Sequence, residues 1–174
     1  MSEPLISIPV GVVAERIRAQ SQWIDYVWRP ANVLEGVPGL QPWTLLEGNN
    51  DRALFYAGAA QVGLYAGDAA HYRENLATGF PKLWVILRPT GVEPPLELVM
   101  VTANPFEGEG LTENAADLVE PVPMPASMQA TITSFVEQHY VHEPFFKRKR
   151  DRADPEALGR RPGGSLKDMR DKKP

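Results

Sequence analysis

The hydrophobic pattern of this chain changes period once, and that change constrains the fold more than any other feature. Up to Met124 the apolar residues alternate or form short runs, which is typical of strands. Beyond it, apolar residues recur at a spacing that gathers side chains on one helical face, in the series Met128, Ile132, Phe135, Val136 and His139. Pro125 suits the first turn of that helix, and Pro144 would end it. We therefore predict a strand-rich body that ends in one well-formed helix.

The strand-like segments are short and are separated by turns rich in glycine and proline. They cover residues 5–13, 23–34, 43–46, 54–65, 82–88, 96–102 and 118–124. The run 82–88 is almost continuously apolar, which predicts a central strand buried on both faces. Pro9 places the first strand near a sheet edge, and the polar residues 15–22 predict a turn. We also expect a short helical turn after Asp68 and an exposed loop with a helical turn over residues 104–117.

This order of elements predicts an α+β fold. We expect a mainly antiparallel β-sheet, curled into a sandwich or a partly open barrel and covered by the C-terminal α-helix. Residues 1–152 would form a single globular domain. Residues 153–174 are highly charged and poor in large apolar side chains, so we expect a basic tail that is disordered unless a partner orders it.

Composition excludes several classes of protein. The 174 residues include no cysteine, which rules out disulfides, thiolate zinc sites and a cysteine nucleophile. The longest apolar runs are far too short to cross a bilayer, and the N-terminus lacks the basic and apolar regions of a signal peptide. We expect a cytoplasmic protein that makes no contact with a membrane.

Charge divides the chain into two parts. Up to Phe146 there are seven Lys or Arg against 17 Asp or Glu, a net charge of −10, and the remainder has 11 against five, a net charge of +6. An acidic body would repel nucleic acid and anionic lipid, so contact with either would have to be made by the basic part. A solvated tail without a binding role is an equally good interpretation of this charge run.

The junction between the two parts is the leading candidate for a binding surface. Two aromatic residues precede a basic run there, in the series Phe145, Phe146, Lys147, Arg148, Lys149 and Arg150. Aromatic side chains are typical centres of protein interfaces, and basic side chains steer association. Acidic residues follow the run at once, which favours a protein partner over nucleic acid. Both phenylalanines could instead close the core beneath the helix.

A second candidate is a ligand pocket formed by Trp28, Arg29, Tyr72 and Asn75. Alternation places Tyr26 and Trp28 on one strand face, where aromatic rings could stack on a ligand. Aromatic residues in such strands are more often core, and that interpretation is favoured.

Candidates for metal and catalytic chemistry are weaker. His139 and His142, with Glu137 and Glu143, could ligate a metal, but their spacing matches no standard zinc helix, and partner-facing or capping histidines are favoured. The chain has neither a Walker loop nor a GxGxxG turn after a strand, and no carboxylate pair can be assigned from sequence. We therefore expect no metal and no cofactor, and a non-enzymatic protein is favoured over an enzyme.

Several segments carry a resemblance to a family of uncharacterised proteobacterial proteins whose genes often lie beside those of molybdenum-dependent formate dehydrogenase. They are IPVGVVAER, WIDYVWRP, YRENL, KLWVILR, VTANPFEGE, VEPVPMP and HYVHEPFFKRKRDR, spread over residues 8–152. Some family members are labelled molybdopterin-guanine dinucleotide biosynthesis proteins. A guanylyltransferase of that kind opens with a glycine-rich nucleotide loop, whereas residues 8–22 contain only one glycine, Gly11. The sequence therefore gives that label no support.

The resemblance implies an accessory role in formate dehydrogenase maturation or assembly. The leading hypothesis is a binding protein that docks a formate dehydrogenase subunit or maturation factor through the helix junction and basic run. One alternative is a pterin- or nucleotide-handling enzyme or carrier in molybdenum cofactor biosynthesis. A second alternative is nucleic-acid binding through the basic tail.

Overall fold

The computed structural model describes residues 2–142 and 144, which contain seven strands and three α-helices. The strands are β1 (Ile6–Arg18), β2 (Tyr26–Glu35), β3 (Thr44–Gly48), β4 (Arg52–Leu64), β5 (Lys82–Pro89), β6 (Leu96–Thr102) and β7 (Leu118–Pro123). The helices are α1 (Ala69–Ala77), α2 (Pro105–Leu111) and α3 (Ala126–His139), with a short 3₁₀ turn before α1 (Ala66–Asp68). None of the described helices is both long and apolar enough to cross a membrane.

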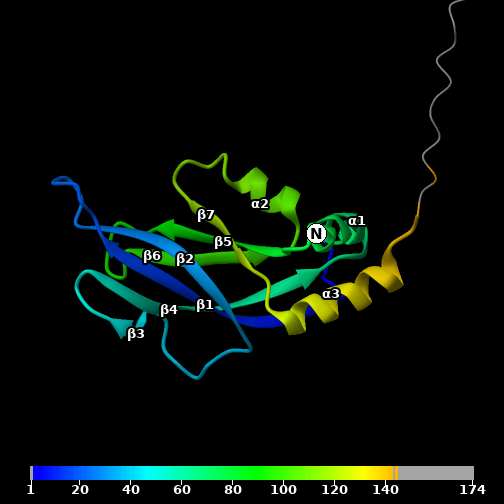
Figure 1. The fold of residues 1–174 in the computed structure, drawn as a ribbon, viewed down its shortest axis with the longest axis horizontal. Helices are drawn as coiled ribbons and strands as arrows, with labels where there is room; N and C mark the ends of the chain where they lie inside the picture. The colour runs from blue at the N-terminus through cyan, green and yellow to red at the C-terminus, as the bar shows by residue number, and fades with distance from the viewer. Residues whose placement is uncertain (1, 143, 145–174) are drawn as a thin grey trace, which may run out of the picture. The chain divides into compact units, whose positions relative to one another are not determined.

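The strands form two antiparallel sheets. One has four strands in the order β2-β1-β4-β3, and the other has three in the order β6-β5-β7. The two sheets lie close together where β6 approaches β4 and β7 approaches β2, and Figure 1 shows the green strands β5 and β6 beside the blue and teal strands. The predicted α+β class and the antiparallel pairing are confirmed, and the described strands do not close into a barrel.

Strand β1 departs most from the sequence prediction, because it extends to Arg18 and has neighbours on both sides. The predicted turn over residues 15–22 is therefore wrong at its start, since Glu15 is a strand residue with a buried carboxylate. The strand lies inside its sheet, not at an edge. Pro9 is nevertheless tolerated because the pairing with β2 begins only at Gly11, so β4 is the sole ladder partner at Pro9.

Two bulges flank the middle of β1. The partner on β2 changes from Asn32 at Val13 to Pro30 at Ala14, so one residue of β2 is unpaired there. On the other side, the partner on β4 changes from Gly58 at Val12 to Tyr56 at Val13. Pro30 lies within β2 without ending it. The strand is at the edge of its sheet and has a bulge beside Pro30, and proline, which has no N–H to donate, is tolerated at such positions.

Strand β5 is the central strand of the smaller sheet, as its apolar run predicts. Leu83, Val85 and Leu87 belong to the main core cluster, while Ile86 is buried outside that cluster. The pairing with β6 forms the predicted hairpin, and the extended segment after Leu118 pairs with the other side of β5.

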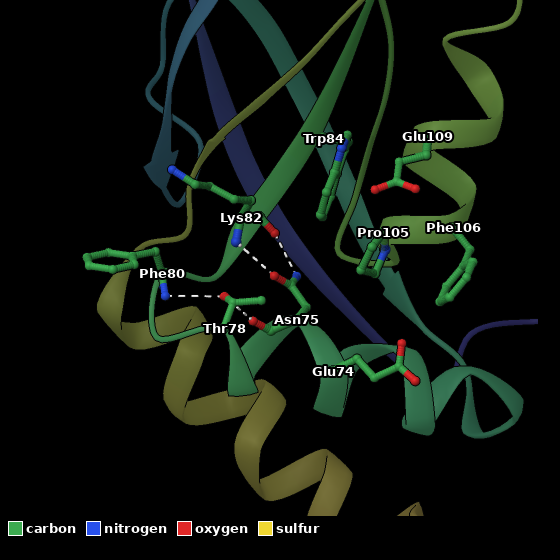
Figure 2. A pocket seen from close by; sticks show the side chains of 9 residues that line it. All are labelled: Glu74, Asn75, Thr78, Phe80, Lys82, Trp84, Pro105, Phe106 and Glu109. Carbon is green, nitrogen blue, oxygen red and sulfur yellow. Dashed lines mark hydrogen bonds between the residues drawn. The ribbon is translucent and has the colours of Figure 1, made fainter.

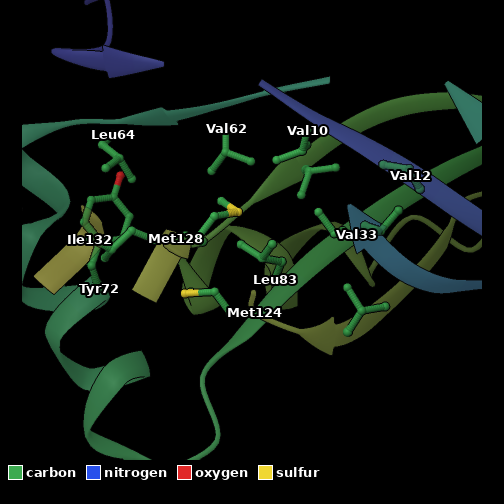
Figure 3. Close-up of a cluster of buried hydrophobic side chains, with 14 of the residues drawn as sticks. Val10, Val12, Val33, Val62, Leu64, Tyr72, Leu83, Met124, Met128 and Ile132 are labelled. Atoms are coloured by element: carbon green, nitrogen blue, oxygen red, sulfur yellow. The ribbon is translucent and has the colours of Figure 1, made fainter. Parts of the chain in front are cut away.

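One hydrophobic cluster joins both sheets and two of the helices (Figure 3). It contains Val10, Val12, Val33, Val62, Leu64, Tyr72, Leu83, Val122, Met124, Met128, Ile132 and Phe135, among others. The buried face of α3 is the face that the helical spacing predicts, except that His139 lies at the half-buried end of the helix against the Phe135 ring. The main neighbour of α3 is α1, and the prediction that α3 covers a sheet stays a prediction.

Candidate functional site

Two of the pockets in the described part of the chain combine several aromatic side chains with charged groups. The first, which we call the aromatic groove, has a volume of about 460 Å³. It lies between α1, the loop after it, β5 and α2 (Figure 2), and its lining residues are Glu74, Asn75, Thr78, Phe80, Lys82, Trp84, Pro105, Phe106 and Glu109. Phe80, Trp84, Pro105 and Phe106 supply apolar surface, and α1, β5 and α2 each contribute one charged side chain.

Helix α2 forms one wall of the groove because it packs directly on Trp84. Gly108 is the buried residue of that helix, and a Cβ atom there would overlap the Trp84 indole. The helix starts at Pro105 and is capped by Asn104, whose side-chain oxygen accepts a hydrogen bond from the Phe106 amide at 3.0 Å. The cap and the glycine together set how closely α2 approaches β5.

Asn75 ties α1 to the two neighbouring strands. Its Nδ2 donates to the carbonyl oxygens of Lys82 and Ala103 at 2.8 and 2.9 Å, and its Oδ1 accepts from the Lys82 amide at 2.9 Å. The amide of Asn75 is therefore engaged with backbone in all three bonds, which Figure 2 shows in part. Asn75 lines the groove, and its side chain holds α1 against the start of β5 and the residue that follows β6.

Two aromatic rings at the groove are largely exposed. Phe80 keeps 79% of its surface accessible and Phe106 keeps 56%. The His71 ring lies 4.5 Å from the Phe106 ring, and His71 Nδ1 is 3.2 Å from Asn104 Nδ2. Burial of a phenylalanine side chain contributes about 1.5–3 kcal/mol, so these rings offer a partner a large apolar gain.

The second pocket, which we call the arginine pocket, has a volume of about 380 Å³. Its lining residues are Arg16, Tyr26, Trp28, Trp43, Phe55, Glu93, Pro94 and Pro95. They come from β1, β2 and β4 of the larger sheet, from the residue before β3, and from the loop between β5 and β6.

Aromatic rings surround the guanidinium of Arg16. Its Cζ atom is 4.2 Å from the centre of the Tyr26 ring, 5.1 Å from that of Phe55 and 5.9 Å from that of Trp28. The Trp28 ring in turn contacts Trp43 edge-on at 5.6 Å and Phe55 at 5.3 Å. The result is a cation held by aromatic faces.

The structure separates the four residues of the predicted ligand pocket. Trp28 lines the arginine pocket and Asn75 lines the aromatic groove. Arg29 instead donates from Nε to the buried carboxylate of Glu15 at 2.5 Å. Tyr72 is buried in the core, and its hydroxyl accepts a hydrogen bond from the Tyr65 amide at 3.1 Å.

Burial also sets the chemistry of Tyr72. Removal from water disfavours the phenolate and raises the pKa of Tyr72 to about 12. The hydroxyl therefore stays protonated at neutral pH, as expected for a core tyrosine. Tyr72 belongs to α1, so it does not bear on the aromatic residues of the predicted strand. Of those, Tyr26 and Trp28 are half-buried and line a pocket, and Trp28 also packs against the core.

The other predicted contact residues lie outside the described part of the chain. Phe145, Phe146, Lys147, Arg148, Lys149 and Arg150 are in this group, as is Glu143. Within residues 2–142 and 144, no three His, Asp or Glu side chains are grouped so that they could hold a metal ion.

Sequence reasoning misses Arg16 because the polar character of residues 15–22 predicts a turn there. The available signal was the continuation of alternation from Val10, Val12 and Ala14 to Arg16, which puts the arginine on the face that carries the core residues. The predicted sharing of one face by Tyr26 and Trp28 is confirmed, since both line the same pocket.

These elements define a mixed α+β protein with two antiparallel sheets around one core. The chain belongs to a family of proteins of unknown function, DUF3305, whose model matches residues 9–150. Comparisons with curated proteins and with solved structures gave no match.

Proposed function

We propose that this protein is a non-enzymatic binding protein that docks a protein partner. The observation that carries the proposal is the aromatic groove, where Phe80 and Phe106 expose their rings beside an apolar hollow. Exposed aromatic rings next to a pocket are typical of the centre of a protein interface, where a partner excludes water from them.

Charge favours a partner with basic groups around an apolar anchor. The groove carries two carboxylates, Glu74 and Glu109, against one ammonium, Lys82. Glu107 and Glu113 lie on or next to the same helix, and the chain up to Phe146 is strongly acidic. A partner segment with an apolar side chain flanked by Lys or Arg would complement this surface.

The sequence resemblance supplies the candidate partner, a formate dehydrogenase subunit or maturation factor. The basic run from Lys147 to Arg150, with Phe145 and Phe146, is proposed as a second contact. The body would then attract basic groups, and the run would attract acidic groups on the partner.

The test is co-purification with co-expressed formate dehydrogenase subunits at low salt. We compare the natural chain with Phe106→Ser, with a variant carrying Ser at positions 147–150, and with Trp23→Ser. Trp23 is the matched control because its ring is 85% exposed and does not line the groove.

Loss of a hot-spot aromatic costs at least about 2 kcal/mol, so Phe106→Ser should reduce recovery of the bound subunit by about tenfold or more. The control should recover the subunit as the natural chain does. Equal recovery with Phe106→Ser would remove the groove from the interface, and equal recovery with the position 147–150 variant would remove the basic run. Failure of the natural chain to recover any subunit would reject formate dehydrogenase as the partner.

A further inference from the structure

Arg16 differs from the other arginines in the described part of the chain. Residues 2–142 contain six arginines, and the other five donate to an oxygen of another side chain, which is Asp51, Glu15, Tyr140 or Asp117. Nε of Arg16 is buried and has no hydrogen-bond partner among the described residues. A buried donor left unsatisfied costs about 1–3 kcal/mol, more when it belongs to a charged group.

The preceding residue of β1, Glu15, does have charged partners. Glu15 is buried, and its two carboxylate oxygens accept hydrogen bonds from Nε of Arg29 and Nε of Arg52. Glu15 and Arg16 point to opposite faces of β1, as successive strand residues do. The acid is neutralised by two arginines, whereas no described residue forms an ion pair with the adjacent cation, which lies against aromatic rings.

Aromatic faces stabilise a guanidinium only in part. A cation–π contact contributes about 0.5–2 kcal/mol. It involves the face of the guanidinium, so the N–H groups in its plane can still donate hydrogen bonds. These donors match the two oxygens of a carboxylate or a phosphate group. In a partly desolvated pocket such a pair is stronger than the same pair in water.

The remaining lining suits a flat ligand body. The pocket volume of about 380 Å³ falls in the range of about 300–1,000 Å³ that is usual for small-molecule sites. Tyr26, Trp28, Trp43 and Phe55 line the pocket, so a planar ring could stack between aromatic side chains.

We propose that the arginine pocket binds a small planar molecule carrying one carboxylate or phosphate group, with Arg16 as the anion-binding residue. The described residue Glu93 lines the same pocket but forms no ion pair with Arg16, so it is available to accept a hydrogen bond from a ring N–H or amino group of the ligand. The Glu93 carboxylate near the ligand disfavours molecules with a second anionic group. This site is separate from the aromatic groove, and the inference does not depend on the proposed docking function.

The test uses tryptophan fluorescence, because Trp28 and Trp43 line the pocket. The probes are matched pairs in which the anionic group is replaced by an amide or removed, and none of them carries an indole ring: 4-hydroxybenzoate against 4-hydroxybenzamide, phenylacetate against phenylacetamide, and adenosine 5′-monophosphate against adenosine. The first two pairs report on a carboxylate and the third on a phosphate. Binding at millimolar probe concentrations is confirmed by calorimetry.

We expect at least one anionic probe to bind saturably and its neutral counterpart to bind about tenfold more weakly or not at all. Arg16→Gln should weaken the anionic probe by about tenfold or more, and Arg16→Lys should retain part of the affinity. Arg18→Gln is the matched control, because Arg18 lies on the same strand and pairs with Asp51 outside the pocket. It should bind the probe as the natural chain does.

Three results would overturn the proposal. They are no binding of any anionic probe to the natural chain, equal binding of an acid and its amide, and unchanged affinity in a folded Arg16→Gln variant. The first two need only the natural chain, so they decide the question even if Arg16 is also required for folding. If Arg16 serves packing alone, its replacement lowers the unfolding temperature while acid and amide bind alike.

Discussion

Glu15 and Arg16, which are neighbours on β1, have different kinds of partner for their charges. Glu15 is 2% exposed and neutralised by Arg29 and Arg52, which are themselves partly exposed. Arg16, on the other face, is surrounded by aromatic rings. From sequence alone these residues are an ordinary polar pair, because the partners of Glu15 lie 14 and 37 positions away along the chain.

Replacement of Glu15 by Gln should destabilise the fold and remove a pH dependence. Burial alone would raise the pKa of Glu15, but hydrogen bonds and charge from Arg29 and Arg52 outweigh it and hold that pKa below its usual range. At pH 7 we expect Glu15→Gln to lower the free energy of unfolding by about 1–3 kcal/mol, towards the lower figure because both arginines are partly exposed. Urea unfolding measures this difference.

The pH dependence follows from the direction of that shift. Because the folded protein holds the proton of Glu15 less tightly than the unfolded chain, the contribution is complete above the unfolded pKa of about 4.3 and is lost as pH falls through the lower folded pKa. The difference in stability between the natural chain and Glu15→Gln should therefore shrink below about pH 4. Glu47→Gln is the control, since Glu47 is exposed on the same sheet. A difference that stays constant down to acid pH would contradict this account.

At the scale of elements, α2 shows why local propensity is a poor guide in this chain. Its sequence PFEGEGL contains two glycines and predicts only an exposed loop with a helical turn, yet it forms a helix against β5. Gly108 is required by the close approach to Trp84, whereas a Cβ at Gly110 would meet nothing. Tertiary packing therefore decides which of the two glycines is structural.

Alanine should lower the free energy of unfolding at Gly108 but not at Gly110. Gly108→Ala should lower the free energy of unfolding by about 1–3 kcal/mol, because the new methyl group overpacks the Trp84 contact. Gly110→Ala should leave it unchanged or raise it by up to about 1 kcal/mol, because alanine favours the helix. Thermal unfolding of both variants measures the contrast, and equal effects would mean that α2 does not pack on Trp84 as described.

At the scale of the whole molecule, the core cluster formed by the described residues lies in the acidic part of the chain. The hydrophobic cluster runs from Val10 to Val136, and the basic part begins at Lys147. The predicted division into a domain over residues 1–152 and a tail over 153–174 stays a prediction, since the tail lies outside the described residues. The pterin-handling and nucleic-acid alternatives also stay predictions.

Removal of residues 153–174 should leave the fold intact, because this segment is highly charged and poor in large apolar side chains, so it has little apolar surface to bury. We expect the unfolding temperature of a chain ending at Arg152 to change by less than about 2 °C, which corresponds to about 1 kcal/mol or less for a domain of this size. Calorimetry of the full and shortened chains measures it. A larger decrease would show that the last residues contribute to the folded body.

The sequence by itself determined the elements whose signal is local. Alternation and apolar runs predicted most strands, the central place of β5 and the helical face of Met128, Ile132 and Phe135, because burial imposes its period on neighbouring residues. Only the tertiary structure decided the length of β1 and the contents of the pockets. The partners of Glu15, the rings around Arg16 and the overlap at Gly108 all come from distant segments, and their contacts depend on strand order and bulges that no local pattern specifies.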